Sequence, residues 1–477
     1  MADDPILVLD LGTTSVKAAH VGRDGRLRGW AERTYAHAPA PHRQDQEDWW
    51  RAVCAAVADL GPARPAAITF SGAMENLVPV DEAGMPCGPA ILYSDPCGEP
   101  FCAEAGAALA AIDAAATLGN APEPLMTAFK IRWLASSAPE VLAAARWLLL
   151  SPKDALILRL TGRAVADPTT ATTSGLMDLA RRQWSEPLLA ALAIERARLP
   201  EILPSNAVVG GLAAGPARQL GLPTGVPVIN GCGDAGAATL GAGCEDVGDI
   251  SVYLGTSGWV ARVVSDAGIA EPRPCYRLAH PAPGRLIEVV PVLAAGECAA
   301  WARRTLGLDP AEADAAALAA DREPPALVFL PYLAGERAPE VHLDARGGFL
   351  GLSSGHGAGE LYLAVLEGVA FAIARNLEAL TGGASVERPV CLTGGGARSA
   401  VWPQVVADVL NAPVVVPPEP TFATSAGAAA LAGAALPARE GRVVPPRSER
   451  RARLERLAAV FAEGTRLARS IRLESSP

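Results

Sequence analysis

Two short sequences, about half the chain apart, constrain the fold more than any other feature. The first follows the apolar run 6–9 and reads Asp10-Leu11-Gly12-Thr13-Thr14-Ser15. The second follows the strand-like run 249–252 and reads Tyr253-Leu254-Gly255-Thr256-Ser257-Gly258. In each, a glycine and hydroxyl residues form a tight turn directly after a strand, and the successive backbone N–H groups of such a turn converge on an oxyanion. The repeat therefore predicts two similar domains that close on one nucleotide.

Only the first copy carries an acid, because Tyr253 stands at the position that Asp10 has in the first. A carboxylate beside a phosphate site is repulsive unless a cation lies between them, so Asp10 predicts Mg²⁺ bound together with a nucleotide. The alternative is that both segments are ordinary hairpin turns that bind nothing.

Composition narrows the class of protein. A chain of 477 residues is long enough for two or three domains, and 50% hydrophobic with 19% charged residues favours a globular over a disordered protein. The net charge of −10 disfavours nucleic acid and anionic membranes as partners. Nine cysteines without a CxxC pair indicate reduced thiols, and acids near the N-terminus do not suit a signal peptide. We therefore expect a soluble, cytoplasmic protein.

Lysine is rare in this chain. Only Lys17, Lys130 and Lys153 occur among 41 basic residues. A chain that otherwise uses arginine would keep lysine where a compact ammonium group matters, or else by chance.

Three further acids are candidates for a site. Glu75 follows a strand-like run, and Asp95 follows a predicted hairpin whose strands are 78–80 and 90–93. Asp234 lies among glycines at the start of an Ala-rich helix, where small neighbours admit a substrate and the helix N-terminus favours a carboxylate. In α/β domains, such strand-to-loop junctions usually carry the site residues. The alternative for each acid is a turn or helix cap.

A third glycine-rich loop lies in the second half of the chain. Gly394-Gly395-Gly396 stands between a predicted strand and a predicted helix, where its backbone could approach a base or ribose closely. The charged tail from about residue 448 predicts a helix that docks on the body through Leu454, Leu457 and Phe461.

Taken in order, these and other segments resemble the FGGY carbohydrate kinases, and among them the xylulokinases most closely. The resemblance extends to about residue 437. One such motif is weak, but eight or more in the family's order are specific. The second-domain signature of the family is also present, from Gly347-Gly348-Phe349-Leu350 to Ala364-Val365-Leu366-Glu367. The other motifs are Asp-Leu-Gly-Thr-Thr-Ser, Gln-Asp-x-Glu-Asp-Trp-Trp, Lys-x-x-Trp-Leu, Pro-Lys-Asp-x-Leu, Gly-x-Gly-Asp, Leu-Gly-Thr-Ser-Gly, Gly-Glu-Arg-x-Pro and Gly-Gly-Gly-Ala-x-Ser.

This resemblance implies an α/β fold of two actin-like (ribonuclease-H-like) ATPase domains with the site in the cleft between them. The N-terminal domain, residues 1–245, would bind the sugar and carry the first phosphate hairpin. The C-terminal domain, residues 246–477, would bind the nucleotide and end in the helical tail. The resemblance also implies ATP and Mg²⁺ as cofactors, Asp234 as the general base that takes the sugar hydroxyl proton, and Asp10 with Asp234 as the metal site. The remaining implied site residues are Gly12, Thr13, Thr14, Gly255, Thr256 and Ser257 around the phosphates, Gly394, Gly395, Gly396 and Ser399 at the adenosine, and Met74, Glu75 and Asp95 with Asp234 at the sugar.

Three departures from the family bear on the substrates. Xylulokinases usually have Met-His-Gly where this chain has Met74-Glu75-Asn76, and the segments around Asp95 and at 422–427 also differ. An ionised carboxylate only accepts hydrogen bonds, so Glu75 and Asp95 predict an uncharged, polyhydroxylated acceptor and disfavour sugar acids. D-xylulose is the first expectation, and ribulose, glycerol or an erythritol-type polyol are the alternatives. The segment 422–427 lies on the adenosine side and leaves the nucleotide preference open.

Two other functions are compatible with such a fold. A non-kinase actin-fold ATPase would keep the phosphate hairpins but would need no acceptor pocket. The presence of Glu75, Asp95 and Asp234 argues against this function. A degenerate sugar-binding relative would have lost catalytic residues, whereas this chain retains them. As partners we expect a small-molecule sugar or polyol and ATP, neither nucleic acid nor membrane, and a homodimer as the form of any self-association.

Overall fold

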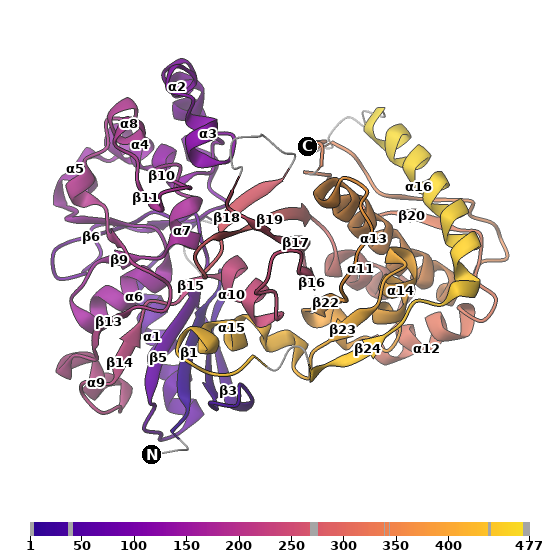
Figure 1. Cartoon of the computed structure of the whole chain (residues 1–477), viewed down its shortest axis with the longest axis horizontal. Coiled ribbons are helices and arrows are strands. Elements are labelled where there is room, and N and C mark those ends of the chain that lie inside the picture. Colours follow the sequence, from indigo (N-terminus) through magenta and orange to yellow (C-terminus); the bar gives the residue numbers. More distant parts are fainter. Residues whose placement is uncertain are drawn as a thin grey trace.

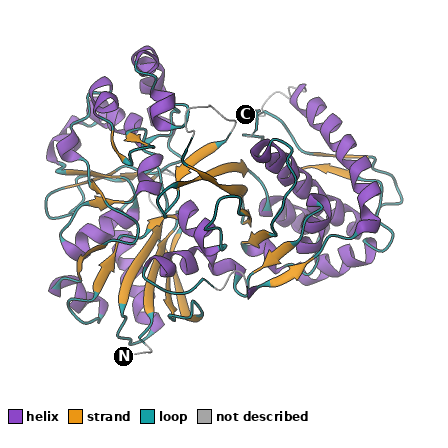
Figure 2. Cartoon of the chain, viewed as in Figure 1, coloured by secondary structure: helices purple, strands orange, loops and turns teal. Residues whose placement is uncertain are grey.

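The structure is a computed structural model that describes residues 4–36, 42–267, 275–337, 339–342, 344–436 and 440–470. Two halves lie side by side, one built mainly from the first part of the chain and the other from the second (Figure 1). Each half contains a seven-stranded sheet with helices packed against it (Figure 2). Residues 471–477 of the predicted tail lie outside the described residues.

The sheet of the N-terminal half forms around its first strand, β1 (Ile6–Leu11). Its apolar run 7–9 has no exposed surface, as expected for a central strand that is covered on both faces. β1 pairs antiparallel with β2 (Ser15–Val21) and parallel with β5 (Ala67–Gly72). The first glycine turn therefore lies beside the C-terminal end of β5. The other strands are β3 (Leu27–Thr34), β13 (Val208–Gly211), β14 (Pro227–Ile229) and β15 (Cys232–Gly233), the last paired with β5.

The sheet of the C-terminal half repeats this arrangement. β16 (Ile250–Leu254) pairs antiparallel with β17 (Gly258–Ser265) and parallel with β22 (Val390–Thr393), just as β1 pairs with β2 and β5. The two glycine turns therefore have equivalent positions, one in each half. The other strands are β18 (Tyr276–Ala279), β19 (Arg285–Val292), β23 (Val414–Val416) and β24 (Arg442–Val444).

Local capping fixes the start of several helices. Asp45 accepts a hydrogen bond from the N–H of Glu47 (2.9 Å) at the start of α1, and Ser151 accepts one from Lys153 (3.3 Å) at the start of α6. The helices of the N-terminal half are α1 (Gln46–Leu60), α2 (Glu99–Ala111), α3 (Ala114–Leu118), α4 (Thr127–Ser137), α5 (Pro139–Ala144), α6 (Pro152–Thr161), α7 (Pro168–Thr172), α8 (Glu186–Ala191), α9 (Ala214–Leu220) and α10 (Asp234–Gly241). Those of the second half are α11 (Gly296–Leu306), α12 (Pro310–Ala320), α13 (Ala358–Thr381), α14 (Trp402–Leu410), α15 (Ala423–Leu431) and α16 (Arg451–Ser470).

The halves meet where α10 and α15 cross. A Cβ added to Gly241 of α10 would lie 1.7 Å from the backbone oxygen of Ala423, and one added to Gly427 of α15 would lie 1.9 Å from that of Ala237. Only glycine fits at either position, because the two backbones touch there. Since α10 begins at Asp234 and α15 also packs against β1 and β5, this crossing links the predicted catalytic acid to both halves.

A second contact between the halves joins α7 to β18. Thr169 donates a hydrogen bond from its hydroxyl to the carbonyl of Ala279 (2.8 Å), and the N–H of Ala279 donates to the hydroxyl of Thr172 (3.0 Å). Nearby, the side chain of Asn120 bonds both backbone groups of Arg277, at 2.7 and 2.8 Å. These bonds hold an edge strand of the second sheet against the N-terminal half.

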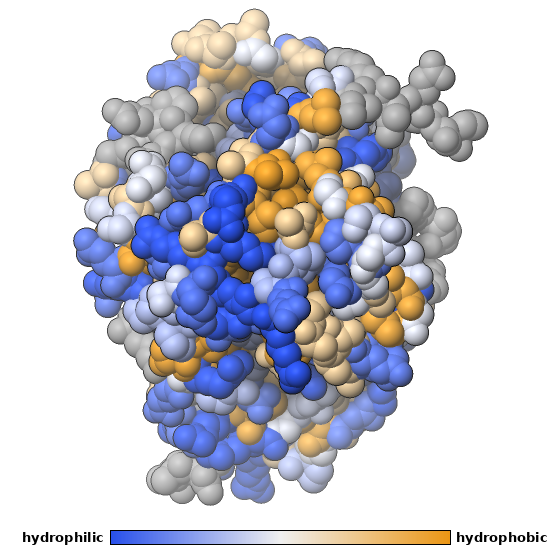
Figure 3. Space-filling model, turned by 90° about the vertical axis from the view of Figure 1, so that its right-hand side faces the viewer, coloured by the Kyte–Doolittle hydropathy of each residue, from blue (hydrophilic) through white to orange (hydrophobic). Residues whose placement is uncertain are grey.

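The C-terminal helix α16 docks as the sequence predicts. Leu454, Leu457 and Phe461 are only 6%, 6% and 3% exposed. Arg453 forms two hydrogen bonds with Glu367 of α13, at 2.6 and 3.0 Å, which adds a charged contact beside the apolar one. The outer face of this half is mainly hydrophilic, with apolar residues in small groups (Figure 3).

The predicted hairpin before Asp95 is only partly formed. Its strands, β6 (Val78–Val80) and β7 (Ala90–Ile91), are joined to each other only through isolated bridges. They pair instead with distant segments, so long-range pairing has replaced the local one. The short two-stranded sheets are β6 with β8 (Trp147–Leu149), β7 with β4 (Arg43–Gln44), β9 (Val165–Ala166) with β12 (Glu201–Ile202), β10 (Met177–Asp178) with β11 (Gln183–Trp184), and β20 (Val328–Leu330) with β21 (Gly348–Leu350).

Two expectations from composition can be compared with the structure. No disulfide bond joins any of the nine cysteines, all of which lie in the described part of the chain. Within the described ranges, no helix combines the length and the apolar character that crossing a membrane requires.

Candidate active site

The ends of β1, β5 and β15 bring the two acids of the predicted metal site together. Asp10 on β1 lies opposite Ser71 of β5, which lies opposite Cys232 of β15. Asp234 follows two residues later as the first residue of α10, and its carboxylate accepts a hydrogen bond from the N–H of Ala235 at 2.8 Å. Both carboxylates are half-buried at the same edge of the sheet.

The surroundings of Asp234 favour its protonated form. Burial is the main reason why the pKa of Asp234 is raised to about 7, and the charges of Asp10 and Asp167 add to the effect. Burial also raises the pKa of Asp10, whereas the ammonium group of Lys17 on β2 lowers it. A carboxylate with a pKa near the working pH can accept a proton from a hydroxyl and release it again, so Asp234 suits the task of a general base.

A glycine lets Met74 lie against the backbone next to Asp234. A Cβ added to Gly233 would lie 2.1 Å from the sulfur of Met74, so no other residue fits there without moving it. Met74 packs against the same small apolar cluster as Trp259 of β17. Met74 of the first half and Trp259 of the second thus pack on one small apolar cluster, together with Ala235, the residue after Asp234.

A buried ionic network lies beneath Asp234. The ammonium group of Lys153 is 2.7 Å from a carboxylate oxygen of Asp154 and 3.0 Å from one of Asp167, and all three side chains are fully buried. Asp167 also accepts a hydrogen bond from the N–H of Gly233 at 3.4 Å. Although burial favours the neutral amine, the two carboxylates raise the pKa of Lys153, so it stays charged. The network therefore anchors the turn that presents Asp234.

The donor set at Asp10 and Asp234 fits Mg²⁺. This ion is usually held by one or two carboxylates, with water and phosphate oxygens completing the octahedron. The hydroxyl of Ser71 is buried beside Asp10 and would add an oxygen to this set. In the described part of the chain, no group of three or more His, Cys, Asp or Glu forms a metal site on its own. A site completed by the nucleotide phosphates is consistent with both observations.

A cavity of about 820 Å³ opens beside the second glycine turn. Gly394 has φ +88°, and a Cβ there would lie 2.6 Å from the backbone oxygen of Leu254, so the third glycine loop packs directly on β16. Six residues selected from the sequence line the cavity, namely Gly255, Thr256, Gly394, Gly395, Gly396 and Ser399. Arg303, Asp314 and Tyr362 also line it, and Asp314 accepts a hydrogen bond from the hydroxyl of Ser399 at 2.9 Å. The volume and polar lining suit a nucleotide.

The first glycine turn contributes to this cavity through Lys17. Gly12, Thr13, Thr14 and Ser257 do not line it, although all four are described. The turn is closed by a hydrogen bond from the N–H of Gly12 to the carbonyl of Ser15 (3.0 Å). Lys17, on the strand that leaves the turn, lines the cavity beside Tyr253 and Gly255. The two hairpins therefore approach one another at this end of the cavity.

Glu75, which the sequence analysis predicts to bind the sugar, has an unusual backbone conformation. Its φ of +63° is rare for a residue other than glycine, and such backbone strain is common at binding sites. Burial, with the charge of Glu123 in support, raises the pKa of Glu75 to about 8, whereas Lys130 and Arg337 lower it. The sequence analysis treated this side chain as an ionised acceptor. In the structure its surroundings favour the neutral acid, which can also donate a hydrogen bond.

The carboxylate of Asp95 already forms hydrogen bonds within the protein. One carboxylate oxygen accepts from the guanidinium of Arg43 at 2.7 Å, and the other accepts from the N–H of Cys97 at 2.9 Å. The ammonium group of Lys130 is buried and faces Asp95 as well as Glu75. Asp95 thus lies close to the acceptor side while also capping a turn.

Both halves contribute charges next to Glu75. Arg337 of the second half donates a hydrogen bond to Glu123 of the first at 2.9 Å, and the hydroxyl of Tyr276 donates to the same carboxylate at 3.2 Å. The guanidinium of Arg337 also lies over the ring of Tyr276. A sugar bound near Glu75 would therefore meet groups from both halves.

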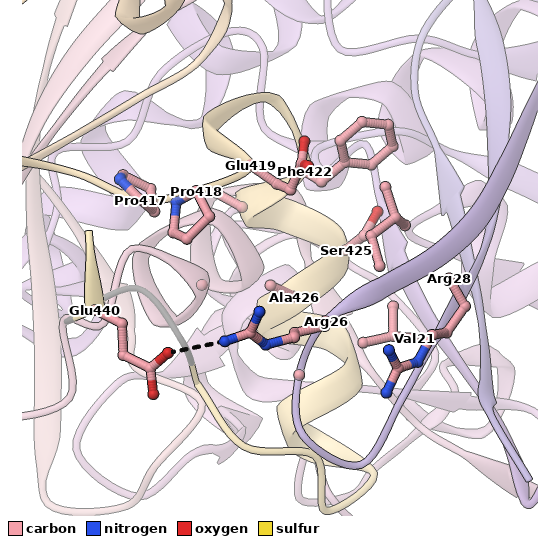
Figure 4. Close-up of a pocket in the computed structure, with 14 residues that line it drawn as sticks. Val21, Arg26, Arg28, Pro417, Pro418, Glu419, Phe422, Ser425, Ala426 and Glu440 are labelled. Atoms are coloured by element: carbon pink, nitrogen blue, oxygen red, sulfur yellow. Dashed lines mark ion pairs between the residues drawn. The ribbon is translucent and has the colours of Figure 1, made fainter. Parts of the chain in front are cut away.

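A second cavity, of about 340 Å³, lies on the other side of the segment 417–423 (Figure 4). Thr421 lines the nucleotide cavity, whereas Phe422 and Glu419 line this one. Arg26 reaches across it from the N-terminal half and forms an ion pair with Glu440 at 3.6 Å. The segment 422–427, which departs from the family pattern, therefore lines this second cavity, through Phe422, Ala423, Ser425 and Ala426, while the preceding Thr421 lines the other.

The rarity of lysine was the best signal for residues near the site that the sequence analysis did not assign to it. Lys17 lines the nucleotide cavity and faces Asp10, Lys130 faces Glu75, and Lys153 lies beneath Asp234. No comparable signal in the sequence selects the other lining residues, Arg303, Asp314 and Tyr362. Arginine and aspartate are common in this chain, and Tyr362 is not among the residues named in any motif.

Comparison with known proteins gives consistent matches over most of the chain. The FGGY family of carbohydrate kinases matches with its N-terminal domain over residues 5–241 and with its C-terminal domain over residues 252–436. The chain is 34% identical over 412 residues to the xylulose kinase of Escherichia coli strain K12, a match that covers 84% of each protein. It is 28% identical over 438 residues to the gluconokinase of Bacillus subtilis strain 168, covering 86% of this chain and 84% of that one.

A solved structure agrees with this result. The crystal structure of a xyloylose kinase from Brucella ovis superposes with a TM-score of 0.84 at 30% identity, covering 97% of this chain and 98% of that one. These matches confirm the expected α/β fold of two actin-like domains, the resemblance to xylulokinases and the phosphorylation of a sugar by ATP. The chain belongs to the FGGY family of carbohydrate kinases and is an ATP-dependent, xylulokinase-like sugar kinase.

Proposed function

We propose that this kinase phosphorylates a hydroxyl group of D-xylulose, with Asp234 as the general base and Mg²⁺ held by Asp10 and Asp234. The observation that carries the proposal is the pairing of these two half-buried carboxylates beside Lys17 and Tyr253, which line the nucleotide cavity. The xylulose kinases among the similar proteins support the choice of sugar.

The chemistry follows from where the charges lie. The sugar hydroxyl gives its proton to the carboxylate of Asp234 as its oxygen attacks the γ-phosphorus of ATP. The bond from phosphorus to the bridging oxygen breaks, and its electron pair leaves with ADP. Mg²⁺, when bound, offsets the charge of the phosphates. Lys17 adds a further positive charge, and the turns at Gly12–Thr14 and Gly255–Ser257 would surround the phosphates, with backbone amides other than that of Gly12 as the donors.

The acceptor pocket in this proposal contains Met74, Glu75 and Asp95. Met74 supplies an apolar surface next to Asp234. A neutral Glu75 can donate a hydrogen bond to a ketose carbonyl and accept one from a hydroxyl, so it can replace the histidine that xylulokinases usually have. Asp95 acts mainly through Lys130, which it helps to keep charged.

A sugar acid is the second candidate acceptor. The expectation that its anion would be repelled assumed that Glu75 is ionised, whereas Lys130 and Arg337 both face that side chain. Two cations beside a neutral acid tolerate a carboxylate, and a gluconokinase is among the similar proteins. Polyols of the glycerol or erythritol type remain further alternatives.

In this proposal, each half of the molecule binds one of the two substrates. Residues 1–245 would bind the sugar through Met74, Glu75 and Asp95, and residues 246–477 would bind the adenosine at Gly394–Gly396 and Ser399. Lys17 is the exception, because it extends from the first half into the nucleotide cavity.

A coupled ADP-release assay tests the proposal. D-xylulose, D-ribulose, glycerol, erythritol and D-gluconate would be compared at equal ATP and Mg²⁺, with a reaction without sugar as the baseline. We expect the highest kcat/KM for D-xylulose. A higher value for gluconate would favour the second candidate, and the absence of ADP release with every sugar would contradict both.

A further inference from the structure

Tyr253 occupies in the second hairpin the position that Asp10 occupies in the first. In the N-terminal sheet, Asp10 lies between Lys17 and Ser71 of the neighbouring strands. In the C-terminal sheet, Tyr253 lies between Trp259 and a threonine of β22. A carboxylate thus faces the phosphate region from one half, and a phenol faces it from the other.

The ring of Tyr253 is fixed above the second glycine turn. It stacks on Trp259 with a centroid distance of 4.1 Å and an interplanar angle of 17°. A Cβ added to Gly255 would lie 2.4 Å from a ring carbon of Tyr253 and 2.8 Å from its hydroxyl oxygen. The hydroxyl is therefore held directly over the glycine of the phosphate turn, where any larger residue than glycine would displace it.

The hydroxyl is also available to a ligand. Tyr253 lines the nucleotide cavity, and its hydroxyl forms no hydrogen bond with another residue in the described part of the chain. Asp10 and Asp234 are its charged neighbours from β1 and α10, close enough that both act on its pKa after burial has raised it. An unpaired donor at this place lies between the phosphate turn and the two acids of the reaction centre.

We propose that the Tyr253 hydroxyl donates a hydrogen bond to the phosphoryl group during its transfer from ATP to the sugar. This inference rests on the proposed function and adds a catalytic residue to it. The phosphoryl group carries its charge on three equatorial oxygens as the bond to ADP breaks, and a fixed donor aimed at one of them stabilises that arrangement. Tyr253 keeps its own proton throughout, since the proton of the sugar hydroxyl goes to Asp234.

A positive donor is already present in Lys17, and the phenol complements it from the opposite half. Asp10 faces the same region and repels the phosphates unless a cation lies between them. A neutral donor on the other side adds no charge that a cation would have to offset. The rigid stacking on Trp259 means that little rotational freedom is lost when the bond forms.

The test is Tyr253→Phe, which keeps the ring, its stacking on Trp259 and its contact with Gly255. We expect kcat to fall by about 10- to 100-fold, the scale of a hydrogen bond to a charged group, with the KM for the sugar unchanged. The affinity for ADP with aluminium fluoride and Mg²⁺, which together imitate the phosphoryl group in transfer, should fall by the same factor. The affinity for ADP alone, measured by calorimetry, should stay the same.

Tyr332→Phe is the matched control. Its hydroxyl bonds Thr465 of α16 at 2.7 Å, away from the nucleotide cavity, so its kcat should equal that of the unmodified protein. If Tyr253→Phe keeps full kcat and full affinity for the aluminium fluoride complex, the inference is wrong. A rise in the sugar KM alone would also overturn it, because the hydroxyl would then bind the acceptor. Neither result would affect the proposed function, which the series of sugars and Asp234→Asn test separately.

Discussion

Replacing Glu75 with glutamine should make the protein more stable at alkaline pH and leave its stability unchanged at acidic pH. Burial, and then Glu123, raises the pKa of Glu75 from 4.5 to about 8, against the opposing effect of Lys130 and Arg337. Because the folded pKa lies above the unfolded one, the stability that this group contributes is complete below pH 4.5 and is lost as the pH rises through about 8. Glutamine resembles the neutral acid and does not ionise.

The size of the effect follows from the same shift. Each pKa unit corresponds to about 1.4 kcal/mol, so the interval from 4.5 to about 8 sets an upper limit of about 5 kcal/mol. Glu75 is half-buried rather than fully enclosed, and Lys130 stabilises the charge once it forms. We therefore expect a gain of about 2 kcal/mol in the free energy of unfolding at pH 8.5. For domains of this size that corresponds to an increase in Tm of about 4–8 °C.

Scanning calorimetry at pH 5 and pH 8.5 measures this difference. Glu75→Gln and the unmodified protein should unfold at nearly the same temperature at pH 5, and the variant should unfold at a higher temperature at pH 8.5. Glu82→Gln, at an exposed position, is the matched control and should show no change with pH. If the Tm difference for Glu75→Gln is the same at both pH values, the side chain ionises normally and the reasoning is refuted.

Three further substitutions test the packing of the fold. Gly427→Ala places a Cβ 1.9 Å from a backbone oxygen of α10, so it should reduce the free energy of unfolding by about 1–3 kcal/mol in urea denaturation; unchanged stability would show that the crossing can relax. Lys153→Met leaves two buried carboxylates unpaired and should cost about 3–5 kcal/mol in the same assay, whereas a loss below 1 kcal/mol would show that the network is not needed for stability. Arg453→Leu leaves the buried Glu367 unpaired, so the amide hydrogens of α16 should exchange faster in the variant than in the unmodified protein. Equal protection of α16 in the two proteins would contradict this.

Local patterns were sufficient for the elements that carry the site. The apolar run before Asp10 became the central strand β1, and the glycine-flanked Asp234 became the first residue of α10. The helix at the C-terminus docked through the three apolar residues that its spacing indicated. These predictions succeeded because each depends on neighbouring residues only, through burial, turn geometry and helical periodicity.

Features that depend on distant residues could not be predicted. The segment 78–80 alternates like one strand of a hairpin, but its partner is β8, almost seventy residues away along the chain. Asp95 looked available to a sugar because its bond to Arg43 cannot be seen in the sequence. Likewise, the ionisation of Glu75 is set by Glu123, Lys130 and Arg337, which only the fold brings together.

The activity of Asp234→Asn tests the central claim most directly. A general base contributes about 10²–10⁴ in rate, so the variant should release ADP with its best sugar at no more than about 1% of the rate of the unmodified protein. Asparagine keeps the shape of the side chain and its bond from the N–H of Ala235, so calorimetry should find almost unchanged affinity for ADP. Asp59→Asn, on the surface of α1, should keep full activity. If Asp234→Asn retains more than about a tenth of the turnover while binding ADP normally, Asp234 is not the base and the proposed mechanism is wrong.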